Sequence, residues 1–411
     1  MTDRNLDTTR VDAANDAINK VLSKYTESGD LKIVAAMVCD SAGELYGGAF
    51  GDTSSADTSS DETGVGGPMA LNSVGAIMSM TKAITGTAAM QLVEKGLLEL
   101  DAPAGDVCPY LAQVQVLTGY DEAGKPQLRA PLTPVTLRNL LTHSSGFVYE
   151  IWNAELQTYV SRTNIPSLFS GLKAALEVPL MFDPGSRWEY GIGIDWVGQM
   201  VEAISGQTLG QYCGQHIFKP LKMLDSGFKP TAAMLGRMTK TLYRNAEGVL
   251  IEPPPPAAEA GPPADFEGGG GGLLSTVRDY SRFLQMILRG GELDGVRVLE
   301  TETVQLMAQN QMGDLRVVSL ISSAPQLSVD AEFFPGEEKS WGLTFQISET
   351  ACATGRQAGT LMWAGLTNCF FWIDHKSDLT GIFLTQVLPF GDPLSLQAFY
   401  EFESEAYNQF A

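Results

Sequence analysis

Strand-like segments lie at both ends of this 411-residue chain, and neither end holds enough of them to bury a sheet alone. Near the N-terminus, the runs KIVAAMVCD and ELYGGAFG are joined by Ser-Ala-Gly and predict a hairpin. Near the C-terminus, four further runs predict strands: WGLTFQIS, GTLMW, NCFFWID and LTGIFLTQVL. We therefore predict one antiparallel sheet built from both chain ends, because only the joined set has enough strands to cover a core.

Helical patterns flank these strands and fill the middle of the chain. Near the N-terminus, apolar residues recur at helical spacing: Val11, Ala14, Ile18, Val21, Leu22 and Tyr25. Asp392 and Pro393 form an N-cap and N1 pair. They open a last helix whose apolar face is Leu396, Phe399, Tyr400, Tyr407 and Phe410. Both terminal helices are expected to pack on the sheet.

The pattern predicts an α/β fold of two parts. Residues 1–70 and 251–411 form a discontinuous α/β domain with the antiparallel sheet, and residues 71–250 form an inserted, mainly helical domain. Functional sites favour such domain seams. Two low-complexity segments interrupt the pattern: a polar loop at 52–67 and a Pro- and Gly-rich, non-helical segment at 252–272.

Composition excludes several classes of function. The formal net charge of −21 repels phosphate backbones and anionic lipid, so nucleic acid and membrane surfaces are poor partners. No run approaches the roughly 20 apolar residues that span a bilayer, and the N-terminal segment lacks a secretory h-region. We expect a cytoplasmic protein, a monomer or homodimer, without a cofactor. Its five scattered cysteines predict buried, reduced thiols, and its three histidines form no HExxH motif that would predict a metal site.

The stretch LNSVGAIMSMTKAITGTAAMQLVEKG, residues 71–96, predicts a helix that carries Ser79 and Lys82 three residues apart. Residues at this spacing share one helix face, so the Ser79 hydroxyl and the Lys82 amine can meet. Apolar neighbours disfavour the ammonium form and lower its pKa, and a neutral lysine can take the serine proton. The alternative is a helix-capping serine with a lysine that extends to solvent.

The SxxK pattern occurs twice more. Ser170–Lys173 predicts an amphipathic surface helix with an exposed lysine, and Ser226–Lys229 predicts a turn because Gly227 and Pro230 flank it. Only the copy at Ser79 lies in a helix that is apolar or small nearly all round. Pattern alone leaves both interpretations of that copy open.

Several segments together resemble the serine β-lactamase-like superfamily of class C β-lactamases and penicillin-binding proteins. SMTK matches its nucleophile motif. FDPGSRWEYGIGIDWVGQMVEAISG (182–206) resembles the segment with the catalytic tyrosine, and MWAGLTNCFFWID (362–374) resembles the active-site edge strand. TLRNLLTHSSGF and GGGGGLLSTVRDYSRFLQMIL are also similar to the family. The resemblance covers nearly the whole chain, in the family's order.

This resemblance implies roles for individual residues. Ser79 is the expected acylated nucleophile, and Lys82 and Tyr190 share the proton transfers, with the pKa of the tyrosine lowered by the lysine. The backbone N–H groups of Ser79 and Leu366 are the expected oxyanion hole. Tyr190 could instead be a loop tyrosine packed on Trp188 or Trp196, but three nearby glycines predict a side chain that is presented rather than buried: Gly185, Gly191 and Gly193.

Two departures from the class C β-lactamase motifs indicate which members of the superfamily the chain resembles most. Tyr190-Gly191-Ile192 stands where class C β-lactamases have Tyr-x-Asn, and Trp363-Ala364-Gly365 stands where they have Lys-Thr-Gly. Both polar anchors for a β-lactam are lost, which disfavours that substrate. The tryptophan version resembles family VIII carboxylesterases, which accept uncharged esters. We expect Trp363, Ala364, Gly365 and Ile192 to contact the substrate.

Three smaller features complete the sequence evidence. VLTGYDEAGKPQLR (116–129) resembles an insert of the fungal statin side-chain acyltransferases. His143 is expected to hydrogen-bond a loop after a helix, because a catalytic role would need partners that the sequence does not place. The five glycines 268–272 lack the GK[ST] ending of a phosphate loop, so they predict a turn with positive φ or a close backbone approach.

Three hypotheses about function follow. The first is a serine carboxylesterase that hydrolyses small or aromatic-alcohol esters through an acyl-serine intermediate. The second is an acyltransferase that passes the acyl group to an alcohol, with weak β-lactamase side activity. The third, from another class, is a catalytically inactive ligand-binding protein. In each of the enzyme hypotheses the partner is a small-molecule ester.

Overall fold

The structure is a computed structural model that describes residues 8–53, 67–252 and 263–411. Most of the predicted loop 52–67, and residues 253–262 of the predicted segment 252–272, lie outside the described residues. Residues 263–272 contain no helix, as expected. All five cysteines are free and buried, which confirms the prediction of buried thiols.

Within the described residues, the main sheet has seven strands in the order β11-β12-β13-β14-β15-β1-β2, and every pair in it is antiparallel. The N-terminal hairpin supplies β1 (Ile33–Cys39) and β2 (Glu44–Gly51). It joins the C-terminal strands where β1 pairs with β15, with Ala36 opposite Phe383. The C-terminal strands are β11 (Lys339–Trp341), β12 (Gln346–Ser348), β13 (Leu361–Gly365), β14 (Cys369–Asp374) and β15 (Leu379–Leu384). The predicted sheet from both chain ends is confirmed.

The prediction of a single strand at 341–348 is wrong. β11 ends at Trp341 and β12 begins at Gln346, and a tight turn between them reverses the chain, with the Gly342 N–H donating to the Phe345 carbonyl at 2.8 Å. The predicted strand 379–388 also divides. Its last part is β16 (Val387–Leu388), which leaves the main sheet and pairs in parallel with β6 (Leu242–Arg244).

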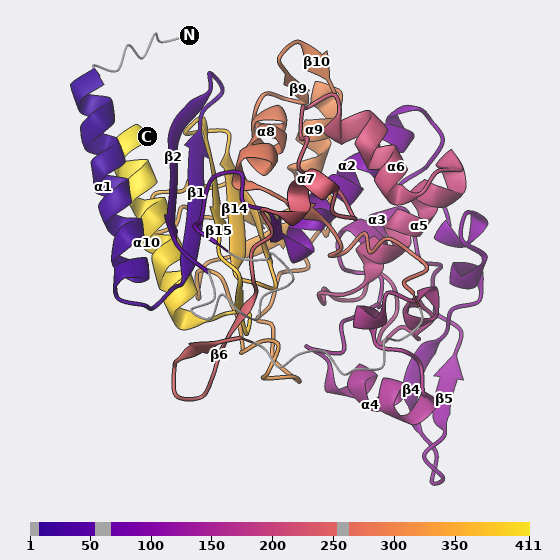
Figure 1. Cartoon of the computed structure of the whole chain (residues 1–411). Coiled ribbons are helices and arrows are strands. Elements are labelled where there is room, and N and C mark those ends of the chain that lie inside the picture. The colour runs from indigo at the N-terminus through magenta and orange to yellow at the C-terminus, as the bar shows by residue number, and fades with distance from the viewer. Residues whose placement is uncertain (1–7, 54–66, 253–262) are drawn as a thin grey trace.

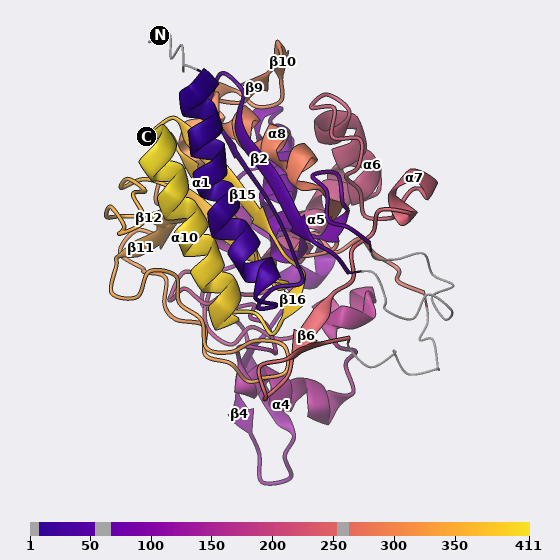
Figure 2. The same cartoon turned by 60° about the vertical axis from the view of Figure 1, so that its left-hand side comes forward.

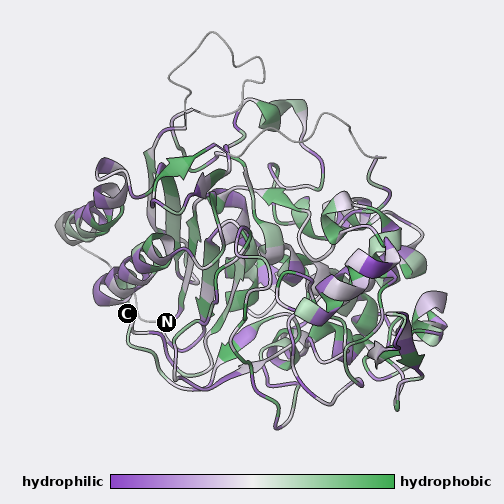
Figure 3. Cartoon of the chain, turned by 90° about the horizontal axis from the view of Figure 1, so that it is seen from below, coloured by the Kyte–Doolittle hydropathy of each residue, from purple (hydrophilic) through white to green (hydrophobic). Residues whose placement is uncertain are grey.

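Helices cover both faces of the sheet (Figures 1 and 2). α1 (Thr8–Glu27) and α10 (Pro393–Phe410) lie side by side on one face, and α8 (Val277–Leu288) covers the other. The Asp392 carboxylate accepts a hydrogen bond from the Ser395 N–H at 3.0 Å, so the predicted cap of α10 is confirmed. Figure 3 shows the hydrophobic residues concentrated on the strands, with hydrophilic stretches on the terminal helices. The core therefore lies between the sheet and its two helical layers.

Most of the described helices between β2 and α8 lie beyond α8, away from the terminal helices, whereas β6 lies below the main sheet (Figure 1). The segment that resembles an acyltransferase insert forms a hairpin of β4 (Val116–Tyr120) and β5 (Pro126–Arg129). The predicted domain boundaries at 70 and 250 stay a prediction. The helices of this region are α2 (Thr81–Glu94), α3 (Leu137–Leu141), α4 (Ala154–Thr163), α5 (Gly193–Ser205), α6 (Leu209–Cys213) and α7 (Ala232–Leu235). Shorter strands and one further helix complete the described α-helices and strands: β3 (Gly75–Ala76), β7 (Leu250–Ile251), β8 (Leu274–Ser275), β9 (Glu292–Leu293), β10 (Val296–Arg297) and α9 (Thr301–Met307).

The predicted helix 71–96 begins later than the sequence pattern indicates. β3 pairs with β8, a 3₁₀ turn covers Met78–Met80, and α2 starts only at Thr81. The Thr81 hydroxyl donates to the Met78 carbonyl at 2.6 Å and accepts from the Leu273 N–H at 3.1 Å. These hydrogen bonds and the β3–β8 pairing hold residues 71–80 out of the helix. α2 itself is buried from Thr81 to Leu92, as its small and apolar residues predict.

A buried ion pair links α10 to the loop before β13. The Arg356 guanidinium donates to Glu403 Oε1 at 2.8 Å, and both side chains are fully buried. Removal of one partner leaves an uncompensated buried charge.

We expect Glu403→Ala to lower the free energy of unfolding by about 3–5 kcal/mol, measured by urea denaturation. Glu405→Ala, on the partly exposed face of the same helix, is the control and should change it by less than about 0.5 kcal/mol. Equal effects of the two substitutions would show that the pair adds nothing to stability.

Candidate active site

The predicted meeting of Ser79 and Lys82 is present. Ser79 lies in the 3₁₀ turn before α2, and Lys82 lies in the first turn of α2. The Lys82 amine is hydrogen-bonded to the Ser79 hydroxyl oxygen at 3.1 Å. Lys82 is 0% exposed, so the alternative of a lysine that extends to solvent is wrong.

Lys82 has two further polar partners. Its Nζ donates to the Gly270 carbonyl at 2.6 Å and lies 2.9 Å from the Tyr149 hydroxyl. A neutral amine has two N–H groups and one lone pair, so three partners satisfy it completely when the Ser79 hydroxyl donates to the lone pair. Three oxygen partners also match the three N–H groups of the ammonium form, so the same contacts accommodate the lysine before and after it takes a proton from Ser79.

Burial lowers the pKa of Lys82 to about 7, and the nearby Asp195 carboxylate opposes this decrease. An ordinary lysine, with a pKa near 10.4, is almost entirely charged at neutral pH. At a pKa of about 7, roughly half of the molecules hold a neutral amine at pH 7. Such a group is well matched to general-base catalysis at that pH.

Tyr190 stands beside this pair, but its ring is buried. It is enclosed by three tryptophans, with ring-centroid distances of 5.4 Å to Trp152, 6.3 Å to Trp341 and 4.8 Å to Trp363. The prediction that the glycine-rich loop presents this side chain to solvent is wrong, because these aromatic rings close over it. Its hydroxyl oxygen accepts a hydrogen bond from the Trp363 indole N–H at 2.9 Å.

The expected decrease in the pKa of Tyr190 is also wrong. Burial raises the pKa of Tyr190 above its ordinary value, and hydrogen bonds with Ser79 and Trp363 oppose this increase only in part. Lys82 Nζ lies over the face of the Tyr190 ring, 4.8 Å from its centroid. Tyr190 therefore stays protonated at neutral pH and is suited to donate a hydrogen bond, which leaves Lys82 as the better base.

His143 holds the loop that carries Tyr190. The His143 carbonyl accepts from the Glu189 N–H at 3.0 Å, and His143 Nδ1 accepts from the Gly191 N–H at 3.3 Å. These two bonds bracket Tyr190 in the chain. The prediction that His143 hydrogen-bonds a loop after a helix is confirmed. Burial and the Lys82 charge lower the pKa of His143 well below its ordinary value, so the ring stays neutral.

Sequence reasoning missed two residues of the site, Tyr149 and Asp195. Tyr149 contacts Lys82 directly, and Asp195 Oδ1 accepts from the Gly270 N–H at 2.8 Å. Asp195 could have been noticed as a lone carboxylate in the apolar first turn of α5. Tyr149 has no such signal, because its contact with Lys82 joins residues 67 positions apart.

The five glycines approach this cluster closely. A Cβ atom on Gly270 would lie 2.4 Å from Asp195 Oδ2 and 2.9 Å from the Tyr149 hydroxyl oxygen, and one on Gly269 would lie 2.9 Å from the Ile194 carbonyl oxygen. No residue of 268–272 has a positive φ. Of the two predicted reasons for this run, close backbone approach is confirmed.

The strand β13 brings most of the predicted substrate-binding segment to Ser79. A Cβ atom on Gly365 would lie 2.3 Å from the Ile77 carbonyl oxygen, so glycine lets the strand end pack against the segment that carries Ser79. A small cavity is shared by Ser79, Tyr190, Trp363, Ala364, Gly365 and Leu366. Ile192 instead lines a different small cavity, which does not include Ser79. The substrate-binding and oxyanion roles of these residues stay predictions.

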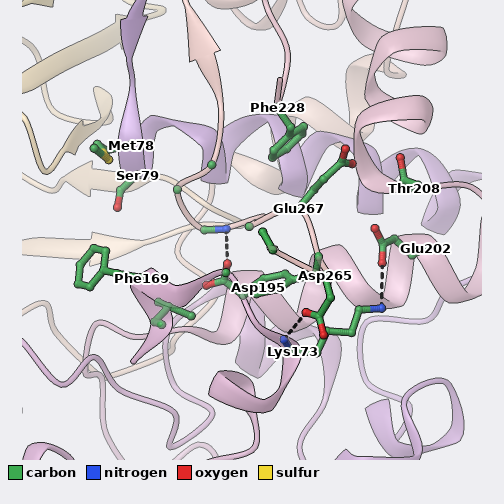
Figure 4. A pocket seen from close by; sticks show the side chains of 18 of the residues that line it. Met78, Ser79, Phe169, Lys173, Asp195, Glu202, Thr208, Phe228, Asp265 and Glu267 are labelled. Atoms are coloured by element: carbon green, nitrogen blue, oxygen red, sulfur yellow. Dashed lines mark hydrogen bonds and ion pairs between the residues drawn. The ribbon is translucent and has the colours of Figure 1, made fainter. Parts of the chain in front are cut away.

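Ser79 opens onto a much larger cavity of about 890 Å³ (Figure 4). Met78 and Ser79 lie at one side of it, and Glu202 and Thr208 lie at the other. Apolar residues make up much of the wall: Met78, Ile151, Trp152, Leu168, Phe169, Phe228, Phe266 and Leu366. Charged side chains also reach it: Lys173, Asp195, Glu202, Lys229, Asp265 and Glu267. This volume is at the upper end of the range for small-molecule sites.

The other two SxxK copies do not reproduce the geometry at Ser79. The predicted surface helix at Ser170–Lys173 is wrong, because 3₁₀ turns cover Leu168–Ser170 and Lys173–Leu176 instead. The Ser226–Lys229 copy is non-helical but is not the predicted turn, because Gly227 pairs with Leu274 in an isolated β-bridge. Its serine hydroxyl donates to Asp279 at 2.9 Å.

Known proteins share both the sequence and the fold. A family model described as Beta-lactamase matches residues 18–403. The chain belongs to the Beta-lactamase family. Monacolin J acid methylbutanoyltransferase of Aspergillus terreus is 29% identical over 352 residues, which cover 84% of each chain. Lovastatin esterase of Penicillium rubens is 31% identical over 354 residues, 84% of this chain and 87% of that one.

Solved structures extend the similarity to this Beta-lactamase family fold. Unliganded simvastatin synthase from Aspergillus terreus has a TM-score of 0.80 at 28% identity, with 97% of this chain and 98% of that chain covered. EstCE1, a hydrolase with promiscuous acyltransferase activity, has a TM-score of 0.73 at 20% identity, which shows a shared fold. The β-lactamase-like resemblance and fold are confirmed, and the protein is a serine hydrolase-type enzyme.

Two structural observations bear on other kinds of site. Across residues 8–53, 67–252 and 263–411, no group of three or more His, Cys, Asp or Glu side chains is placed to hold a metal ion. No helix in the described part of the chain has both the length and the apolar character needed to cross a bilayer.

The lowered pKa of Lys82 predicts the pH dependence of catalysis. With the neutral amine as the predicted base, kcat/KM for p-nitrophenyl butyrate should fall about tenfold per pH unit below the pKa of about 7 and level off above it. Stopped or continuous assays between pH 5 and 9, with the fold checked by circular dichroism, measure this profile. A flat profile through pH 6–8 would contradict the assignment of Lys82 as the base.

Proposed function

We propose that this protein is a serine carboxylesterase that acts on uncharged esters through an acyl intermediate on Ser79. The observation that carries the proposal is the fully buried Lys82 amine bound to the Ser79 hydroxyl at the side of a cavity of about 890 Å³. A nucleophile, its base and a large substrate cavity therefore occur together.

The geometry suggests the following acylation step. Neutral Lys82 takes the proton of the Ser79 hydroxyl as Oγ bonds to the ester carbonyl carbon. The carbonyl oxygen gains the negative charge, which the N–H groups of Ser79 and Leu366 are proposed to stabilise. When the C–O bond breaks, the Lys82 ammonium gives its proton to the departing alcohol oxygen. The protonated Tyr190 hydroxyl is placed to stabilise the reacting oxygens by hydrogen bonding.

Deacylation repeats these transfers with a second nucleophile. Lys82, neutral again, takes a proton from water, and the water oxygen bonds to the acyl carbonyl carbon. Collapse of this second intermediate releases the carboxylic acid and returns the proton to Ser79 Oγ. An alcohol in place of water would give a new ester by the same route.

The residue at position 363 favours neutral esters over β-lactams. Trp363 stands where class C β-lactamases have a lysine, and its indole N–H is already bonded to Tyr190. This position therefore offers no cation to a substrate carboxylate. A single butyryl group would fill little of the cavity, so we propose aromatic or larger alcohols as the natural leaving groups.

Acyl transfer is the second candidate function. The similar fungal proteins are named for moving a methylbutanoyl group to monacolin J acid, and another is named as a lovastatin esterase. Both activities can pass through the same acyl-serine, so the relatives support transfer as well as hydrolysis. The large cavity provides space for an acceptor alcohol after the first alcohol leaves.

The serine assignment predicts the effect of Ser79→Ala. Turnover of p-nitrophenyl butyrate should fall by at least about 10³-fold, because the variant has no atom to acylate. The midpoint of thermal unfolding should change little, since the methyl group remains. Activity of Ser79→Ala within tenfold of the wild type would contradict the proposal. In the wild-type protein, labelling of Ser79 without product release would favour an inactive ligand-binding protein.

Acyl transfer predicts a response to an added acceptor. Cyclohexanol should raise the rate of nitrophenol release when deacylation limits turnover, and mass spectrometry should detect cyclohexyl butyrate. An equal amount of the non-nucleophilic solvent acetonitrile controls for solvent effects. Hydrolysis alone predicts that butyric acid remains the sole acyl product at every cyclohexanol concentration.

A further inference from the structure

We propose that Asp195 is a positioning residue that holds the Lys82 amine in place through Gly270 and sets how strong a base that amine is. This inference rests on the proposed function of Ser79 and Lys82 and extends it to a buried carboxylate outside the predicted catalytic set.

The connection runs through both backbone polar groups of one glycine. Asp195 Oδ1 accepts a hydrogen bond from the Gly270 N–H at 2.8 Å, and the Gly270 carbonyl accepts one from Lys82 Nζ at 2.6 Å. Thr85 fixes the preceding residue by donating to the Gly269 carbonyl at 2.8 Å. The carbonyl that receives the lysine therefore lies on a backbone segment tied to α5 and α2.

Gly270 has no room for a side chain at this point. A Cβ atom would lie 2.4 Å from Asp195 Oδ2, a distance that real Cβ atoms do not adopt. Glycine allows the Asp195 carboxylate, the Tyr149 hydroxyl and the Lys82 amine to meet around one backbone position. The absence of a side chain at Gly270 thus lets these three groups approach its backbone.

Burial of the Asp195 carboxylate lowers the stability of the fold. Asp195 is 2% exposed, and its Oδ2 atom has no hydrogen-bond partner among the residues that the structure describes. A buried, half-satisfied carboxylate usually costs a few kcal/mol of stability. Its place in the first turn of α5 offsets part of this cost, because the positive end of the helix dipole favours an anion there. Packing alone does not explain a carboxylate at this position.

An electrostatic effect on Lys82 explains the buried Asp195 carboxylate better than packing does. The other titratable side chains that face Lys82 are Tyr149, Tyr190 and His143. Burial raises the pKa of both tyrosines and lowers that of His143, so all three stay uncharged at neutral pH. Burial also raises the pKa of Asp195, and Lys82 and the Gly270 N–H oppose that increase. In its charged form, Asp195 opposes the effect of burial on Lys82, whose pKa is about 7.

Asp195→Asn separates the charge from the geometry, because the asparagine oxygen can still accept from the Gly270 N–H. Loss of the negative charge makes Lys82 a weaker base. The acid limb of kcat/KM for p-nitrophenyl butyrate should move down by about one pH unit, and the plateau of kcat should fall about tenfold. KM should stay within about twofold of the wild-type value, because a neutral ester forms no ion pair with this carboxylate in the cavity wall.

Asp279→Asn is a matched control. Asp279 is also a buried aspartate in the first turn of a helix, α8, and it accepts from the Asp225 N–H at 2.7 Å. It does not line the substrate cavity, so its pH profile should match that of the wild type. Asp195→Ser is the second variant. It removes the charge, its smaller side chain fits the same space, and its acid limb should also move down.

An acid limb that stays at the wild-type pH in Asp195→Asn, with activity lowered equally at every pH, would overturn the proposal in favour of a structural role. Unfolding of both Asp195 variants while Asp279→Asn stays folded would overturn it in the same way. Neither outcome touches the proposed function, which Ser79→Ala tests separately.

Discussion

The active site depends on the burial of the Lys82 amine. Lys82 carries its Nζ out of water and into contact with the Ser79 hydroxyl, the Tyr149 hydroxyl and the Gly270 carbonyl. An ammonium ion is costly in such a place, so burial favours the neutral form. We propose that the Asp195 carboxylate, which accepts a hydrogen bond from the Gly270 N–H, keeps Lys82 from becoming too weak a base.

Three parts of the chain must come together to make this environment. The 3₁₀ turn Met78–Met80 supplies the nucleophile, and α2 supplies the lysine. The segment from Tyr190 into α5 supplies the tyrosine and Asp195, and the glycine run before α8 supplies the carbonyl. The end of β13 closes the group at Gly365, which packs against the Ile77 carbonyl. The sheet from both chain ends thus places the C-terminal strand beside a nucleophile that lies near residue 80.

Local sequence signals predicted the parts of the fold that local physics decides. The hairpin around Ser-Ala-Gly, the Asp392 cap and the Ser79–Lys82 spacing each depend on neighbouring residues, and all three are present. Long-range contacts decided the rest. The start of α2 is set by pairing of β3 with β8, and Tyr190 is buried by tryptophans from distant segments. The missed contacts of Tyr149 and Asp195 likewise join residues far apart in the chain.

The central claim is that Ser79 carries an acyl group during turnover, and direct mass measurement tests it. The protein is mixed with p-nitrophenyl butyrate, quenched in acid within seconds, weighed intact and digested for peptide mapping. The account predicts a butyryl adduct on the peptide that contains Ser79, together with catalytic release of nitrophenol. Catalytic release of nitrophenol with the adduct on another residue, or with no adduct while a fluorophosphonate probe also fails to label Ser79, would contradict it.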